Sequence, residues 1–257
     1  MFRPLGSWLA HYLNRPVGAT TMVATSDLKS LRAALQPGDV LLIEGNTRIS
    51  VAIKYLTQST WSHAALYVGS YASLPAWGDE PAVLIEADLD AGVRAVPLSH
   101  YAMAHTRICR PVGLTDEDRK RVIEYVVGRL GHRYDLRNVI DLVRYLLPTL
   151  PVPTRWRRRM LALGSGDPTR AICSTLIAQA FQSVRYPILP VITRAKLDDP
   201  ACAGCYREYL HIRHHSLFTP RDFDISPFFE IVKPALAQGF NYRALAWADT
   251  SGDSGKL

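Results

Sequence analysis

The feature that most constrains the fold is a series of short apolar runs, four to seven residues long, separated by turn residues between positions 36 and 110. Their length, their alternation and the turn residues around them are typical of β-strands. The runs that predict strands are residues 40–43, 63–69, 83–87, 93–96 and 106–110. The third and fourth runs are joined by a turn that ends in Gly92. We therefore expect an antiparallel set of strands.

Helical periodicity follows in three places. Thr47 and Thr115 each precede an apolar stripe, and threonine is a residue type that caps helix N-termini. The second of these helices is expected to end at Gly131. A third helix begins near Ile172 and ends before Pro187, because proline cannot continue a helix. From Pro187 onward we expect irregular structure. Together these patterns predict an α+β protein.

The length and composition of the chain restrict its class. With 257 residues and 48% hydrophobic content, the chain is large enough to bury one core. Its apolar runs all fall short of the roughly 18 residues that a membrane-spanning helix needs. The N-terminal segment lacks the continuous apolar region and cleavage site of a secretory signal. Four cysteines are too few for a disulfide scaffold. We therefore expect a cytoplasmic protein with free thiols.

The net charge of +7 is concentrated in one part of the chain. Residues 119–159 contain eleven Lys or Arg and three acidic residues, a local net charge of +8. Within the Pro-rich stretch 138–171, an apolar segment leads into Arg155-Trp156-Arg157-Arg158-Arg159. This combination can dock on an anionic membrane surface, at the inner face of the membrane, or form a solvated basic face. No nucleic-acid partner is expected, because no recognisable binding motif accompanies the charge.

Cys173 is the cysteine best placed to act as a nucleophile, because it lies in the first turn of the third predicted helix. The partial positive charge and unpaired amides of a helix N-terminus favour a thiolate, the nucleophilic form of the side chain. The same amides, especially that of Cys173 itself, are suited to stabilise an oxyanion on an attacked carbonyl. The alternative is a cysteine that only packs in the core.

His63 and Glu86 are the candidate partners of this thiol. His63 opens a predicted strand and shares its face with Tyr67, because side chains alternate along a strand. An imidazole there can accept the thiol proton if the fold brings the two together. Glu86 interrupts a neighbouring apolar strand and can orient the ring nitrogen remote from sulfur. A structural histidine and a solvated carboxylate are the alternatives, so the residues permit a triad without requiring one.

Several motifs occur along the chain in the order of one known family. They are Pro37-Gly38-Asp39-Val40, Trp61-Ser62-His63, Ile85-Glu86-Ala87, Gly131-His132-Arg133-Tyr134-Asp135, Ile172-Cys173-Ser174-Thr175 and Phe218-Thr219-Pro220-Arg221-Asp222. Together they resemble the YiiX-like permuted papain-type cysteine hydrolases, which are relatives of bacterial cell-wall amidases and of lecithin retinol acyltransferase. In that family the histidine precedes the nucleophile. Ile172 departs from the family pattern, which often has an aromatic residue before the cysteine.

The resemblance implies a circularly permuted papain-like fold, with an antiparallel sheet or barrel packed against the helix that carries the nucleophile. It implies acyl transfer by Cys173, His63 and Glu86, without a cofactor, on a peptide, amide or lipid acyl substrate. A non-catalytic, membrane-associated binding module that retains the fold is the alternative. Additional candidates for contacting the substrate or the oxyanion are Tyr67, Ser174 and Tyr134.

The domain boundaries that we expect follow from these assignments. They are residues 1–35 for an N-terminal amphipathic segment, 36–235 for the catalytic domain, with its basic insertion at about 138–171, and 236–257 for a C-terminal tail.

A second group of residues has the types that bind zinc: Cys202, Cys205, His211 and His214. The spacing between Cys205 and His211 is short for a zinc finger. We therefore favour a reduced cysteine pair without metal and keep a structural metal site as the weaker alternative.

Overall fold

The computed structural model describes residues 12–13, 15–17, 24, 26–71, 74–88, 91–132, 172–196, 206–237, 239, 241 and 243 of the chain. Its centre is a six-stranded sheet in the order β10-β7-β1-β2-β5-β6, in which every neighbouring pair is antiparallel. The strands are β1 (Val40–Ile43), β2 (His63–Tyr67), β5 (Leu84–Asp88), β6 (Gly92–Val96), β7 (Thr106–Pro111) and β10 (Phe229–Val232). The five strands predicted from the sequence therefore all lie in one sheet.

Helices cover both faces of this sheet, because alternate side chains of the strands are apolar on both sides. On one face, Ala64 and Leu66 pack with side chains of α4 (Asp116–Val127), α7 (Ile172–Ser183) and α8 (Pro220–Asp224). On the other face, Ala65 packs with side chains of α2 (Leu28–Ala34) and the 3₁₀ helix η1 (Leu98–Tyr101). The strands are thus buried on both faces, which accounts for their nearly continuous apolar sequences.

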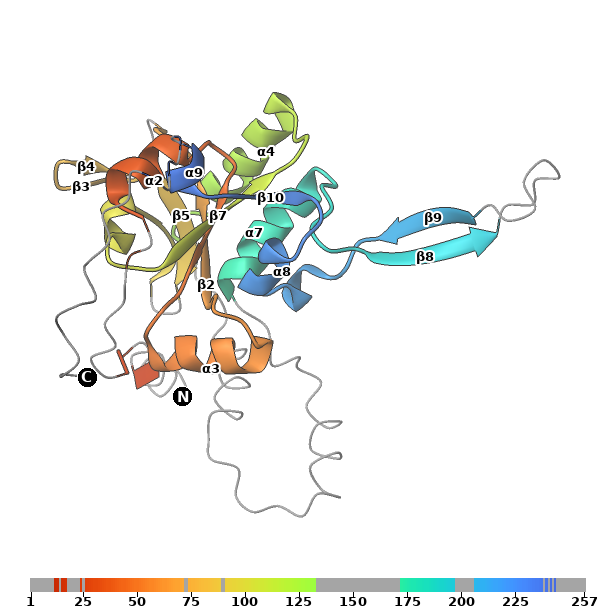
Figure 1. Ribbon diagram of the computed structural model, residues 1–257, viewed down its shortest axis with the longest axis horizontal. Coiled ribbons are helices and arrows are strands. Elements are labelled where there is room, and N and C mark those ends of the chain that lie inside the picture. Colours follow the sequence, from red (N-terminus) through yellow and green to blue (C-terminus); the bar gives the residue numbers. More distant parts are fainter. Residues whose placement is uncertain are drawn as a thin grey trace, which may run out of the picture.

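One end of the sheet is bounded by α3 (Arg48–Thr57), which lies near the end where β1 finishes and β2 begins (Figure 1). Thr47 caps α3 and Thr115 caps α4, each by accepting a hydrogen bond from a backbone amide three residues later, as predicted. The predicted end of α4 was wrong: the helix stops at Val127, and residues 128–131 form turns with Gly131 at a φ of +78°.

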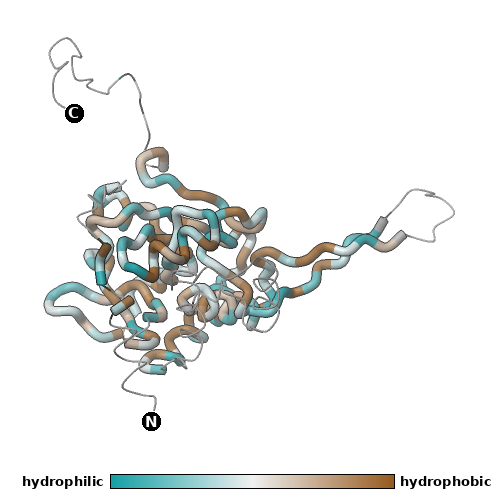
Figure 2. Tube along the Cα trace, turned by 90° about the horizontal axis from the view of Figure 1, so that it is seen from below, coloured by the Kyte–Doolittle hydropathy of each residue, from teal (hydrophilic) through white to brown (hydrophobic). Residues whose placement is uncertain are grey.

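The expectation of irregular structure after Pro187 was also wrong. Most of the described residues there form β8 (Val191–Lys196), β9 (Tyr206–His211), the 3₁₀ helix η2 (His215–Leu217), α8, β10 and α9 (Pro234–Ala237). The edge strand β10 was missed because its alternation extends over only four residues. The β8–β9 hairpin extends away from the body (Figure 1), with hydrophobic residues near its base (Figure 2). Because most of its side chains are exposed on both faces, its sequence does not show the pattern of a half-buried strand.

A small hairpin of β3 (Ala76–Trp77) and β4 (Glu80–Pro81) completes the elements. Among the described helices, none has the length and apolar character required to cross a membrane.

Candidate active site

Cys173 occupies the first turn of α7, whose apolar face packs against the sheet at β2 and β5. Its side chain is only 5% exposed. The first amides of an α-helix have no acceptor within the helix, and the helix dipole is positive there, so this end of α7 is suited to face an anion. The Cys173 Sγ atom lies 3.9 Å from the hydroxyl of Ser174, which is fully buried. The position predicted for the thiol, at a helix N-terminus, is therefore the observed one.

His63 is the first residue of β2 and lies close enough to Cys173 for the thiolate to raise the pKa of its imidazole. The ring nitrogen Nε2 is 3.0 Å from Oε2 of Glu86. This contact leaves Nδ1 as the nitrogen for the thiol. The imidazole is 22% exposed, whereas the Glu86 side chain is only 1% exposed. A histidine thus lies between a buried carboxylate and a thiol, in the arrangement that proton transfer requires.

Glu86 is held by two further side chains. It lies at the centre of β5, where the sheet register pairs it with Ala65 on one side and Arg94 on the other. Arg94 donates a hydrogen bond from Nε to Oε1 of Glu86 at 2.9 Å, and its terminal nitrogen lies 2.8 Å from the same oxygen as an ion pair. The hydroxyl of Tyr101, from η1, donates to Oε2. Glu86 therefore accepts hydrogen bonds from three different elements.

The proton affinities of these groups are shifted in the directions that favour an ion pair. Burial alone would raise the pKa of the Cys173 thiol, but the His63 imidazole and the amide of Ala64 lower it overall. Burial opposes the charged form of His63, yet the thiolate and Glu86 raise the pKa of its imidazole well above 6.5. Glu86 has a pKa of about 2, because His63 and Arg94 overcome the penalty of its burial. The site therefore favours a thiolate next to an imidazolium.

Comparison with known proteins agrees with this fold. Residues 34–145 match the family model of the permuted papain-like amidases YaeF and YiiX, the C92 family. The structure has the predicted α+β, permuted papain-like fold, and over residues 34–145 the chain is similar to the YaeF/YiiX group. The matched stretch includes His63 and Glu86 and ends before Cys173.

A similar solved structure is that of YiiX from Escherichia coli O157:H7, described as a metalloprotein. It is 16% identical, and the alignment covers 78% of this chain and 97% of that one, with a TM-score of 0.46. No curated protein matched the sequence.

Two of the other predicted contact residues in this permuted papain-like chain are placed by the structure. Ser174 is next to the thiol. Tyr67 is four residues from His63, about 13 Å along β2 at ~3.3 Å per residue. There it is close to Arg32 and Asp39, and its burial raises the pKa of its hydroxyl. The structure thus places Tyr67 at the opposite end of β2 from His63.

Other predicted residues fall outside the described part of the chain. These are Tyr134, the basic segment 155–159, Cys202 and Cys205. His211 lies on β9, where its Nε2 is 2.7 Å from the hydroxyl of Thr193, and His214 contacts Ser216. Within the described residues, no group of three His, Cys, Asp or Glu side chains could hold a metal ion.

Arg94 and Tyr101 are the site residues that sequence analysis missed. Arg94 had a detectable signal, because the turn ending at Gly92 fixes a hairpin register in which Glu86 faces Arg94. Tyr101 had none, because it reaches Glu86 from a short 3₁₀ helix that has no strand or helix periodicity.

The segment before His63 is anchored by polar contacts of its own. Trp61 is buried, and its indole N–H donates to Asp224 of α8 at 3.0 Å. Arg107 donates to the same carboxylate at 2.6 Å. The hydroxyl of Ser62 accepts from the amide of Gly45 at 2.8 Å. These contacts fix the backbone direction at which His63 enters β2.

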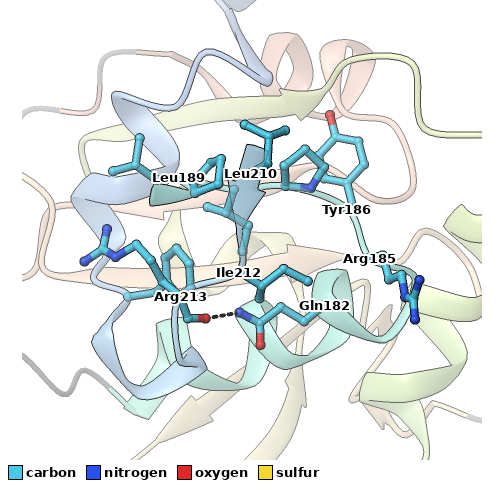
Figure 3. A pocket seen from close by; sticks show the side chains of 11 residues that line it. Gln182, Arg185, Tyr186, Leu189, Leu210, Ile212 and Arg213 are labelled. Atoms are coloured by element: carbon cyan, nitrogen blue, oxygen red, sulfur yellow. Dashed lines mark hydrogen bonds between the residues drawn. The ribbon is translucent and has the colours of Figure 1, made fainter. Parts of the chain in front are cut away.

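A cavity of about 180 Å³ lies near the other end of α7. Tyr186, Leu189, Leu210 and Ile212 line it together with Gln182 (Figure 3). Gln182 is nine residues from Cys173, about 14 Å along the helix at 1.5 Å per residue. The cavity is therefore separate from the thiol site.

Proposed function

We propose that this protein is a cysteine amidase that forms a thioester on Cys173, with His63 as acid and base and Glu86 as the residue that orients His63. The family match supports a cysteine hydrolase in general. The observation that carries the more specific proposal is the His63 ring, which bonds Glu86 through Nε2 and faces the thiol of Cys173.

The chemistry follows from these positions. The Cys173 thiolate attacks the carbonyl carbon, and the electron pair of the C=O bond moves to oxygen, near the amides at the start of α7. The tetrahedral intermediate collapses and breaks the C–N bond, while the imidazolium of His63 protonates the leaving nitrogen. His63 then removes a proton from water, which attacks the thioester carbonyl and releases a carboxylic acid and the thiolate.

Trapping of the acyl-enzyme tests this proposal. Incubating the full-length protein with p-nitrophenyl acetate is expected to release p-nitrophenol and to add one acetyl group to Cys173, detected by peptide mass spectrometry. His63→Ala should slow acetylation by at least ~100-fold, within the range for loss of a general base. His211→Ala is the control, because this imidazole lies on the exposed hairpin.

The non-catalytic alternative gives a different result. A binding module that retains the fold has no need of a thiolate. Its Cys173 would be acetylated no faster than an ordinary buried thiol. Acetylation that is equally fast in the wild type and in His63→Ala would also contradict the proposed role of His63.

A further inference from the structure

The two oxygens of Glu86 have different partners. Oε1 has both contacts with Arg94, a hydrogen bond from Nε and an ion pair with the terminal nitrogen, and Oε2 accepts from His63 and from the hydroxyl of Tyr101. An ionised carboxylate has about four acceptor positions, so these four contacts use all of them. With its side chain 1% exposed, Glu86 has little access to water that could replace a lost partner.

We propose that Arg94 and Tyr101 are positioning residues that determine which chemical group position 86 presents to His63. Arg94 has only donors and keeps its charge, so it binds an acceptor oxygen of residue 86. The second oxygen is left for Nε2–H of His63, and Tyr101 holds that oxygen in place. This arrangement keeps the proton on Nε2 and leaves Nδ1 to exchange a proton with Cys173. The inference rests on the proposed function, because the position of this proton matters only if His63 acts on the thiol.

The consequence is that an amide cannot replace the carboxylate while Arg94 is present. In Glu86→Gln, the amide has one acceptor oxygen, which Arg94 binds, so its NH₂ group faces Nε2 of His63. Two N–H groups cannot bond each other. The ring therefore accepts at Nε2 and carries its proton on Nδ1, the nitrogen that faces the thiol. Replacing Arg94 frees the amide to turn its oxygen toward His63 and Tyr101.

The surroundings of Glu86 supply one more charged group. Asp88, on the same strand, lies 3.5 Å from Arg94 and is 21% exposed. It is farther from the guanidinium than Glu86, which lies 2.8 Å from it. Arg94 therefore determines whether residue 86 presents an oxygen or an NH₂ group to His63.

The inference is tested by the effect of Arg94→Gln on the alkylation rate of Cys173. This change should slow alkylation in the wild type and accelerate it in Glu86→Gln. The measurement is the rate of iodoacetamide alkylation of Cys173 at pH 6 in the full-length chain, with the site mapped by mass spectrometry. Glu86→Gln and Arg94→Gln should each be slower than the wild type, the first by about tenfold or more, as for loss of a hydrogen bond to a charged group. The double variant should be several-fold faster than Glu86→Gln, although it carries a second destabilising change.

The matched control is Arg110→Gln. Arg110 likewise holds a buried carboxylate, donating from two nitrogens to the two oxygens of Asp39 near the opposite end of the sheet. Combined with Glu86→Gln, it should give no recovery. For the role of Tyr101, Tyr101→Phe should slow alkylation several-fold. Tyr186→Phe, which removes a hydroxyl bonded to the carbonyl oxygens of Val112 and Phe228, should not.

The outcomes separate the inference from the proposed function. If wild-type Cys173 reacts at pH 6 no faster than a free thiol, the proposed function fails. If the wild type reacts fast but the double variant is no faster than Glu86→Gln, or Arg110→Gln restores the rate equally, the positioning role is wrong. NMR of ¹⁵N-histidine-labelled protein gives an independent readout: Glu86→Gln should carry the neutral His63 proton on Nδ1, and Nε2 protonation there would contradict the inference.

Discussion

At the scale of single residues, the site depends on a buried carboxylate that stays ionised. Glu86 has its pKa lowered to about 2 although it is almost fully buried, because His63, Arg94 and Tyr101 stabilise its charge. The ordinary value is 4.5. A group whose pKa is lower in the folded state stabilises the fold above its unfolded value, and this contribution is lost as the pH falls toward the folded value.

The first prediction concerns this loss. The free energy of unfolding should decrease as the pH falls from about 4.5 toward 2, and the decrease should be shallower in Glu86→Gln, which has no proton to bind at this position. Urea unfolding at a series of pH values measures both slopes. Equal slopes would show that Glu86 binds its proton with the same affinity in the folded and unfolded chains.

The residues of the site were predictable to different degrees. Cys173 and His63 stand out because a helix start and a strand start place their side chains at the ends of elements. Glu86 is a charge in an apolar strand. Tyr67 shares a strand face with His63 but lies four positions away at the other end of β2, so a shared face alone does not place it at the thiol. Tyr101 could not be predicted, because its contact with Glu86 depends on how η1 packs on the sheet.

At the scale of elements, the position of Cys173 depends on the packing of α7. Phe181 is completely buried and contacts the rings of Tyr186 and Phe229, with ring centroids 5.5 and 5.3 Å apart. The helix is thus attached to the sheet at the edge strand β10 as well as at β2 and β5. The five sheet strands between residues 40 and 111 and the starts of α3 and α4 were predictable because their periodicity reflects burial, whereas α2, η1 and the β3–β4 hairpin were not predicted.

The second prediction follows from this packing. Phe181→Ala should lower the free energy of unfolding by about 3–5 kcal/mol, the usual cost of removing a buried aromatic side chain. Val51→Ala on α3, where the side chain is 45% exposed, should change it by less than ~0.5 kcal/mol. Chemical denaturation of both variants measures these values. A small effect of Phe181→Ala would mean that α7 is held mainly by other contacts.

At the scale of the whole molecule, a thiol from near residue 173 is brought to a histidine near residue 63 by a sheet whose strands come from both halves of the chain. Strand β10, close to the C-terminus, pairs with β7 and thereby closes the edge of the sheet beside α7. The order of β10 in the sheet and the extended β8–β9 hairpin could not be predicted, because neither is determined by local periodicity. The fold therefore brings Cys173 next to His63, which the sequence alone did not establish.

The central claim is that this proximity makes Cys173 a thiolate activated by His63. Its most direct test is the pH dependence of iodoacetamide alkylation at Cys173, compared between the wild type and His63→Ala, with the completely buried Cys109 as an internal reference thiol. The account predicts fast alkylation of wild-type Cys173 below pH 7 that is lost in His63→Ala, with Cys109 unreactive in both. Alkylation of wild-type Cys173 that follows the profile of a free thiol would contradict it.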